Sequence, residues 1–384
     1  KLGVIYEKGQ GVKQSQADSQ HRLGLMYGKG EGVKQDFVKA REWYLKAASQ
    51  GDADSQHALG LMYDNGEGVK QDFVKAREWY LKAAAQGHAN SEHTLGYIYY
   101  RGLGVKQDYV KSREFYLQAA SQGHADSQHN LGVMYHNGQG VKQNLAKARQ
   151  LFLQAASQDH YFAQYRLGVI YHEGQGVKRD SVKSREWHLK AASLGHPGSQ
   201  HILAGIYHNG VGVKQDSIKA LEFYLKAASQ GHRDSQHNLG IMHHYGQGVK
   251  QDPVKAEEWY LQAISAGQSN SMHNLGVMYY NGEGVKQDLA KARKLFLQAA
   301  SHDFTASMHI LGIMYFAGQG VEIDYPKAKE WFEKAASQGN NSSQYSLGLI
   351  YYNGQGVKQD LIKAREFLLK AAAQGHVQAQ NRLA

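Results

Sequence analysis

The sequence predicts an all-α protein, a solenoid of 36-residue helix-turn-helix repeats. Three observations support this prediction. A Leu-Gly pair recurs at 36-residue spacing from Gly24 to Gly348, with Ala204 replacing the glycine once. Each period contains two stretches in which apolar residues have the spacing of an amphipathic helix. Helix-stop glycines and capping Asp residues separate these stretches at the same positions in nearly every period.

The number of repeats follows from this spacing. Gly3 and Gly24 are only 21 residues apart, so the first unit lacks a second helix. We expect residues 1–14 to be a truncated repeat whose end is frayed or rearranged. Ten full repeats in one continuous solenoid are expected over residues 15–376, and residues 377–384 begin a further, truncated repeat.

Capping and helix-stopping residues predict the ends of both helices. The second helix begins after an Asp such as Asp72 in DFVKAREWYLKAAAQG, whose carboxylate can accept hydrogen bonds from free N–H groups. It ends at a glycine such as Gly87, and the first helix ends at a pair such as Gly66 and Gly68. A phosphate-binding loop would need a strand before its glycines and a helix start after them. Here the glycines follow a helix and recur in nearly every repeat, which favours a helix stop.

The repeated string AxSQxxLGxMYxxGxGVxxDxxKAxxWYxKAAxxG closely resembles the Sel1-like repeat (SLR), a relative of the tetratricopeptide repeat. The resemblance covers essentially the whole chain. It implies a right-handed α/α solenoid, a bacterial source, and an adaptor role of the kind that SLR proteins have in envelopes and in secretion or host-interaction systems. Some bacterial members are linked to penicillin-type substrates, but those resemblances rest on cysteine-stapled repeats, and this chain has no Cys.

The first helix of each repeat has one constant face and one variable face. In the fourth full repeat the constant face consists of Ser127, Gln128, Leu131, Gly132, Met134 and Tyr135. We expect this face to pack, with the small residues Ser127 and Gly132 letting neighbouring helices approach closely. The opposite face carries Asp126, His129, Asn130, Val133, His136 and Asn137, and its counterparts differ from repeat to repeat.

The variable face contains a column of aromatic and His side chains. First helices line the concave surface of helical-pair solenoids, and such surfaces bind extended partners. Aromatic residues are also favoured in protein interfaces. The alternative is that an unconstrained surface has drifted after duplication. We expect partner contacts on the concave face from Tyr100, Arg101, His136, His172, His208, His244, Tyr245, Tyr280, Phe316 and Tyr352.

Fourteen of the 21 His residues form two further columns. The first contains His57, and Tyr165 and Tyr345 replace His there, which indicates a flat ring that fills space between repeats. The second contains His88, one residue after a helix-ending glycine, which indicates a capping or turn role. No two His lie three or four residues apart, so no helix offers paired zinc ligands and no metal site is expected. The columns are expected to titrate together near pH ~6.5 and to weaken the array in acid.

The positive charge lies away from the predicted groove. The net charge is +10, with one Lys column in the loops (Lys70) and another on the second helices (Lys75). Glu42 and Lys46 have the spacing of a favourable ion pair, which Glu78–Lys82 and Glu366–Lys370 repeat. Because the groove is nearly neutral, nucleic-acid binding is not expected.

The sequence favours a binding protein over an enzyme. It contains no Cys, S-x-x-K, G-x-S-x-G or H-E-x-x-H motif, and almost every polar residue recurs in many copies. We therefore expect a non-enzymatic scaffold or adaptor for a protein or peptide partner, without cofactors or membrane insertion. The chain is expected to be a monomer, with end-to-end association through its truncated ends as an alternative.

Two other functions stay open at this stage. One is a cell-envelope protein that engages glycan or peptidoglycan, and the other is an immunity-type protein that neutralises a toxin or secretion effector. Direct glycan binding would distinguish the first alternative, and a neighbouring toxin gene would support the second. The sequence favours neither a periplasmic or secreted location nor a cytoplasmic one.

Overall fold

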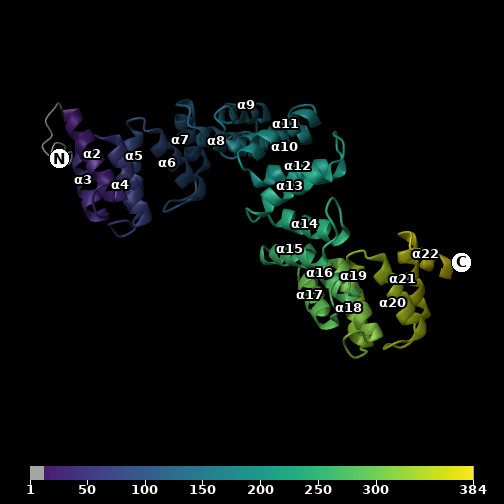
Figure 1. The fold of residues 1–384 in the computed structure, drawn as a ribbon. Helices are drawn as coiled ribbons and strands as arrows, with labels where there is room; N and C mark the ends of the chain where they lie inside the picture. The colour runs from purple at the N-terminus through teal and green to yellow at the C-terminus, as the bar shows by residue number, and fades with distance from the viewer. Residues whose placement is uncertain (1–12, 384) are drawn as a thin grey trace. The chain divides into compact units, whose positions relative to one another are not determined.

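The computed structural model describes residues 13–383, and all regular structure in that range is helical (Figure 1). The helices pair into the α/α hairpins that the sequence predicts. The first helices of the repeats are α2 (Lys13–Lys29), α4 (Ala53–Asn65), α6 (Ala89–Arg101), α8 (Ala125–Asn137), α10 (Tyr161–Glu173), α12 (Pro197–Asn209), α14 (Arg233–Tyr245), α16 (Ser269–Asn281), α18 (Thr305–Ala317), α20 (Asn341–Asn353) and α22 (Val377–Leu383). The second helices are α3 (Phe37–Ser49), α5 (Phe73–Ala84), α7 (Tyr109–Ser121), α9 (Leu145–Ala156), α11 (Ser181–Ser193), α13 (Ser217–Ala228), α15 (Pro253–Ser265), α17 (Leu289–Ser301), α19 (Tyr325–Ser337) and α21 (Leu361–Ala373).

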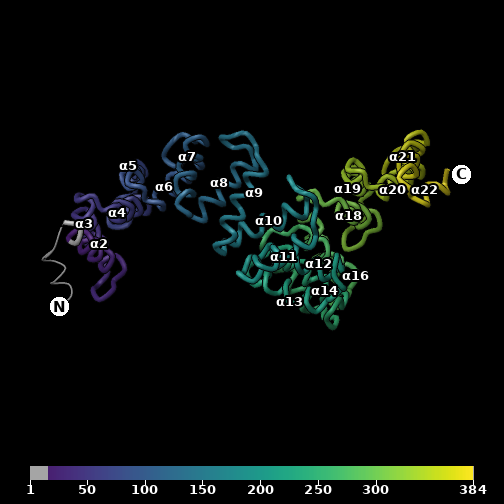
Figure 2. The backbone as a smooth tube through the Cα atoms, turned by 90° about the horizontal axis from the view of Figure 1, so that it is seen from above, coloured from purple at the N-terminus to yellow at the C-terminus, as the bar shows by residue number. Residues whose placement is uncertain are grey.

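The chain divides into two compact units, residues 1–196 and residues 197–384. Within each unit the hairpins follow one another in chain order (Figure 2). A second helix packs on the first helix before it and on the first helix that follows it in the same unit. The expected frayed end at residues 1–14 falls largely on residues 1–12, which lie outside the described residues. A single continuous solenoid over residues 15–376 stays a prediction.

The predicted caps are present. Asp72 Oδ1 accepts hydrogen bonds from the backbone N–H groups of Val74 and Lys75 at 3.1 and 3.0 Å, and Asn144 caps α9 in the same way. Gly66 ends α4 in the left-handed conformation, with φ of 76°. Asp159 and Asp303 adopt φ of 58° and 60° at the position where other repeats have the glycine that follows the second helix. The predicted helix ends are therefore confirmed by local geometry.

Two glycines are required by close packing in most repeats. An ideal Cβ on Gly60 would lie 2.4 Å from the ring of Tyr80, so the absent side chain lets this buried ring lie against the first helix. A Cβ on Gly68 would lie 2.7 Å from the carbonyl oxygen of Phe37 in the preceding repeat. The small residues of the packing face therefore admit the close approach that the sequence predicts.

The contacts between successive repeats place the two His columns side by side. The ring of His57 lies 5.4 Å from the ring of Tyr80 and 4.8 Å from that of His88, and its Nδ1 atom lies 2.9 Å from Ser91 Oγ. His88 caps α6 by accepting from the N–H of Ser91, and its Nε2 atom lies 3.1 Å from Asp54 Oδ1. The predicted roles of the two columns, ring packing and capping, are both confirmed. The same bond to a Ser 34 residues on is made by His21, His93, His201, His237, His273 and His309.

Burial changes the expected titration of the first His column. Burial, together with the nearby His88, lowers the pKa of His57 to about 4. The pKa values of His93, His129, His201 and His273 are also about 4, with burial as the main cause. The expectation that these rings titrate near pH 6.5 is therefore wrong for the folded chain, because the surrounding side chains exclude the water that would solvate their charged forms.

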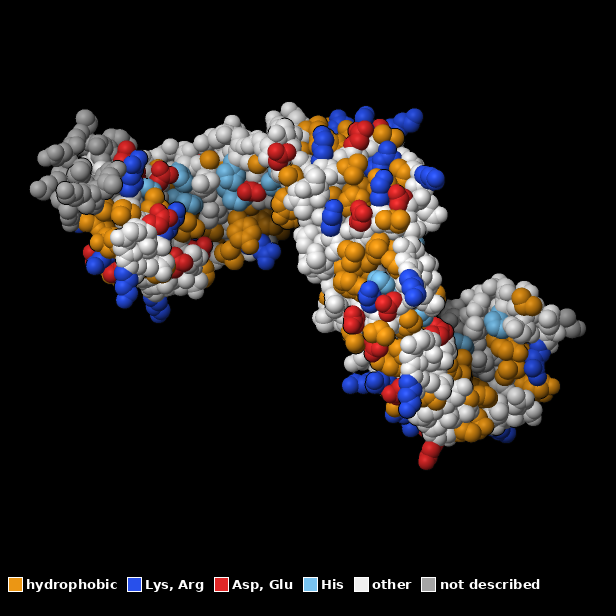
Figure 3. Space-filling model, viewed as in Figure 1, with side chains coloured by type: hydrophobic (Ala, Val, Ile, Leu, Met, Phe, Trp, Pro, Cys, Tyr) orange, Lys and Arg blue, Asp and Glu red, His pale blue; other side chains and the backbone are white. Residues whose placement is uncertain are grey.

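The surface charges are largely paired or placed over aromatic rings. Lys75 lies 3.8 Å from Asp72 Oδ2, whereas the loop column that includes Lys70 has no ion pair among the described residues. Of the three predicted i,i+4 pairs only Glu366–Lys370 forms, at 2.6 Å. Lys46 and Lys82 instead lie 3.9 Å from the ring centres of Trp43 and Trp79 on their own helices, because the indole face attracts the ammonium group. On the face in Figure 3, basic and acidic side chains are interspersed.

Candidate functional site

Eight of the ten predicted contact residues occupy equivalent positions, and we call them the ring column. Each is the penultimate residue of a first helix: Tyr100, His136, His172, His208, His244, Tyr280, Phe316 and Tyr352. The other two predicted residues, Arg101 and Tyr245, are the last residues of α6 and α14. The constant repeat length therefore places the predicted site at the C-terminal ends of the first helices, in both units.

The predicted residues differ in exposure. Arg101 and His172 are exposed in the first unit, and Tyr245 and Tyr352 are 61% and 44% exposed in the second. Tyr100, His136, His208, Tyr280 and Phe316 are half-buried. Four of the ten side chains are therefore exposed, with the Arg382 guanidinium 4.9 Å from the ring centre of Tyr352, and five are half-buried.

His244 is a correction to the predicted site. Its side chain is almost completely buried, at 3% exposure, so it is not available for direct contact. Its Nε2 atom lies 2.9 Å from Glu283 Oε2 in the next repeat, and its ring stacks on Tyr245 at 4.3 Å. It thus supports the exposed Tyr245 ring. The sequence pattern could not separate these roles, because the two residues are neighbours on the same helix end.

Several rings of the column bond to the glycine loop of the following repeat, 39 residues on. The hydroxyl of Tyr100 donates to Gln139 Oε1 at 3.2 Å, and His136 Nε2 lies 2.7 Å from Gln175 Oε1. The hydroxyl of Tyr280 donates to Gln319. These bonds hold part of the predicted contact surface in a fixed arrangement, which a variable column in the sequence does not indicate.

The half-buried rings also pack against the second helices of their own repeats. Tyr100 meets Tyr109 at the start of α7 edge to face, with ring centres 5.3 Å apart. Phe316 meets Tyr325 at the start of α19 in the same way, also at 5.3 Å. Removing these two rings would therefore change packing as well as surface. The exposed members of the site are the better choice for binding experiments.

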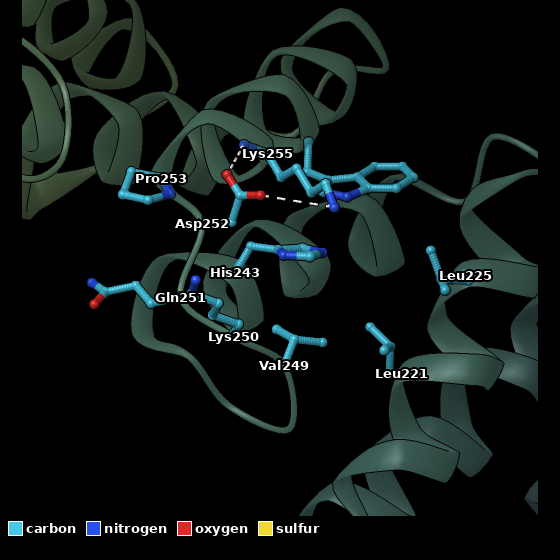
Figure 4. A pocket seen from close by; sticks show the side chains of 10 residues that line it. Leu221, Leu225, His243, Val249, Lys250, Gln251, Asp252, Pro253 and Lys255 are labelled. Atoms are coloured by element: carbon cyan, nitrogen blue, oxygen red, sulfur yellow. Dashed lines mark hydrogen bonds and ion pairs between the residues drawn. The ribbon is translucent and has the colours of Figure 1, made fainter.

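A second surface, which the sequence reasoning missed, lies on the second helices. In the second unit a hollow of about 710 Å³ is bounded by Leu225 of α13, by the loop residues Val249 and Lys250, and by Trp259 of α15 (Figure 4). In the first unit a hollow of about 870 Å³ occupies the equivalent place beside Leu81. The signal that could have revealed it is the Leu that recurs on the outer side of almost every second helix.

Neither surface contains a cluster of metal-ligating side chains among its described residues. Among residues 13–383, no three His, Cys, Asp or Glu side chains come together in a way that could hold a metal ion. Within the same range, no helix has both the length and the apolar composition needed to cross a bilayer. The hollow on the second helices recurs in both units with similar types of lining residue, so it is a repeated feature of this surface.

Comparison with known proteins assigns the repeat type. The family model described as Sel1 repeat matches residues 1–17, 17–52, 53–88, 89–124, 125–160, 162–196, 197–232, 233–268, 269–304, 305–340 and 341–376. The solved structure of a protective antigen with the SLR fold from uropathogenic Escherichia coli is 33% identical, with a TM-score of 0.83, covering 99% of this chain and 85% of the antigen. A Sel1 repeat protein from Oxalobacter formigenes is 32% identical, with a TM-score of 0.62, covering 80% of this chain and 90% of its own. No curated protein sequence matches significantly.

Proposed function

The chain belongs to the Sel1 repeat family, and from this premise we propose that it is a non-enzymatic scaffold that binds a polypeptide partner along its first helices. Members of the family are typically protein-interaction scaffolds, which supports the general class of function. The choice of surface rests on the molecule itself. The junctions between repeats reuse the same side chains, whereas the ends of the first helices differ from one repeat to the next.

The observation that carries the proposal is the set of exposed side chains at these helix ends. Arg and Tyr are enriched among the residues that contribute most of the binding energy at protein interfaces, so their recurrence on an exposed surface favours a binding role. Arg101, His172, Tyr245 and Tyr352 are exposed on equivalent helix ends, at the last or penultimate position. They give each unit two separate anchors, which suits an extended segment or a surface ridge.

The absence of a unique polar constellation supports a binding function over catalysis. A catalytic site needs a nucleophile, base or metal held in one specific arrangement. Here half-buried His residues bond Ser hydroxyls and cap helices at successive junctions, as His57 and His88 do. Their chemistry is therefore used for stability. A polypeptide partner is also favoured over nucleic acid, because the ring column contains no Lys or Arg.

Partner capture tests this proposal. We would immobilise the chain, expose it to a lysate of the source organism, and identify bound proteins by crosslinking and mass spectrometry. The variant carries R101A, H172A, Y245A and Y352A, all at exposed positions. A control carries V110S, V182S, V254S and I362S, which are exposed on second helices, also two per unit. We expect a protein captured by wild type and control and lost by the variant. Loss with the control alone would move the site to the second helices.

Two alternatives remain distinguishable in the same experiment. If the captured material is glycan or peptidoglycan, purified peptidoglycan fragments should bind the chain directly. If the partner is a toxin or secretion effector, adding the chain should block its activity. Capture of the same protein by wild type, variant and control would contradict both proposed surfaces.

A further inference from the structure

One repeat of the second unit has a hollow in the ring column itself. It measures about 200 Å³ and lies between α12 and α14. It is lined by the polar side chains of His208, Asn209, Asn238 and Gln247, by Tyr224 of α13, and by the apolar side chains of Ile241 and Met242. The hollow is therefore part of the predicted contact surface, and all of its residues belong to one compact unit.

In another repeat, the equivalent of His208 lies within hydrogen-bond distance of the equivalents of Asn209 and Gln247. In the first unit, His136 Nδ1 lies 3.0 Å from Asn137 Oδ1, and its Nε2 lies 2.7 Å from Gln175 Oε1. The residues at the equivalent positions of the second unit are His208, Asn209 and Gln247. No hydrogen bond joins the His208 ring to either amide in the described part of the chain, and its Nδ1 atom is buried without a partner. We call the two sets the closed triad and the open triad.

A glycine in the middle of α12 leaves open space beside Tyr224, which lines the hollow. Gly205 lies three residues before His208, and the equivalent residue is Val133 beside the closed triad and Val, Leu, Ile or Tyr in every other full repeat. A Cβ built on Gly205 would meet only the Tyr224 hydroxyl, at 3.9 Å, so nothing fills the place of the missing side chain. Glycine is a poor residue for a helix interior, which means that local folding preference does not explain its presence.

The lining defines the kind of group that fits. None of the lining residues carries a formal charge apart from a protonated His, so a charged ligand would lose its hydration without a fixed counter-charge. Ile241 and Met242 offer an apolar wall and a thioether suited to an aromatic ring. The His208 ring and the Gln247 amide can donate or accept a hydrogen bond at the opposite side. The group that meets both demands has an apolar body and a polar tip.

We propose that the open triad is a pocket for the phenol side chain of one tyrosine of the partner polypeptide. The volume is below the roughly 300–1,000 Å³ of sites for small-molecule ligands and suits a single side chain. Tyrosine combines a large ring with one hydroxyl, and it is enriched at interfaces for that reason. This inference rests on the proposed scaffold function, because it supplies an anchor point on the first-helix surface.

The tyrosine side-chain analogue p-cresol tests the pocket without the partner. We would label the Met methyl groups of the full chain with ¹³C and titrate p-cresol while recording NMR spectra. The expected result is a saturable shift of the Met242 methyl signal with Kd on the order of millimolar. Toluene, which lacks the hydroxyl, should bind about three- to tenfold more weakly. No saturable shift at Met242, or equal binding of toluene, would overturn the proposal.

A filled-pocket variant provides the matched control. G205V introduces valine, the residue type found at the equivalent position, Val133, beside the closed triad. The open space beside Gly205 can hold the valine side chain. We expect G205V to keep the melting temperature of wild type or exceed it, and to lose the Met242 shift with p-cresol. An unchanged shift in G205V would also overturn the proposal. Because p-cresol needs no partner, its failure would leave partner capture by Arg101, His172, Tyr245 and Tyr352 to be judged separately.

Discussion

The junctions between repeats and the ring column show two uses of one repeated sequence. At the junctions, His57, Ser91 and their counterparts make the same contact in repeat after repeat. In the ring column, even the same residue type has different surroundings. His136 lies within hydrogen-bond distance of Gln175, whereas His208 lines a hollow beside Gln247. The repeated contacts at the junctions therefore stabilise the fold, whereas the ends of the first helices vary from repeat to repeat.

Acid should act on the junctions and produce the largest effect. The folded chain holds the pKa of His57 and similar rings at about 4, below the value near 6.5 of the unfolded chain. The unfolded state therefore binds more protons between these values, and stability is complete above pH 6.5 and lost as pH falls toward 4. Each such ring should cost about 2 kcal/mol at pH 5 relative to pH 8.

Thermal melts at pH 8, 6 and 5 check this prediction. We expect a large fall in melting temperature at pH 5. The double variant H57Y, H93Y places tyrosine at two junctions, as Tyr165 and Tyr345 do naturally at two others. Its melting temperature should fall less between pH 8 and pH 5 than that of wild type. Equal melting temperatures at pH 5 and pH 8 would contradict the account of the junctions.

Filling the space between Gly60 and the Tyr80 ring should have the next largest effect on stability. In G60A the new methyl group would lie 2.4 Å from the ring of Tyr80, which is fully buried and has no room to move. We expect a loss of about 1–3 kcal/mol in the free energy of unfolding, measured by urea denaturation. G205A is the matched control, because its Cβ meets only a hydroxyl at 3.9 Å, and it should be neutral or stabilising. A destabilised G205A would show that helix approach is tight in the ring column as well.

Removing a His cap should have a smaller effect. H88A deletes the acceptor for the Ser91 N–H at the start of α6 and should cost about 1 kcal/mol of stability. H88N should recover most of this loss, because Asn340 caps α20 with the same geometry. Hydrogen exchange of the first turn of α6 measures both changes locally. Unchanged protection in H88A would mean that ring packing alone holds the junction.

The exposed members of the site should have the smallest effect on stability. Y245A and H172A remove side chains from the surface, and each should change the free energy of unfolding by less than about 0.5 kcal/mol. F316A, in contrast, removes a ring that packs on Tyr325 and should destabilise measurably. Urea denaturation of the three variants gives the comparison. A large loss in Y245A would show that the ring column serves stability throughout.

The repeat architecture could be predicted because its signals are local. Asp72 caps the helix that follows it, and Gly66 ends the helix before it, so neighbouring residues in the sequence define each boundary. The His columns could be interpreted for the same reason, since Tyr165 replaces a ring and Asn340 replaces a cap. Repetition then extended each local inference along the chain.

The site could be predicted only in part because exposure depends on contacts between repeats. His244 is buried by Glu283 and Tyr245, while His172, with the same letter in the same position, is exposed. Such pairings need the spatial arrangement of successive repeats. The choice of Lys82 between Glu78 and Trp79 is made within α5 and depends on side-chain conformation.

The affinity for the captured partner tests most directly whether the ends of the first helices form the binding surface. Isothermal titration would give Kd for wild type, for R101A/H172A/Y245A/Y352A, and for the second-helix control V110S/V182S/V254S/I362S. If the first helices bind the partner, the first variant should lose at least about thirtyfold in affinity, or about 2 kcal/mol, and the control should match wild type. Equal affinity of wild type and the first variant, with both folded, would contradict the claim that the variable ends of the first helices form the binding surface.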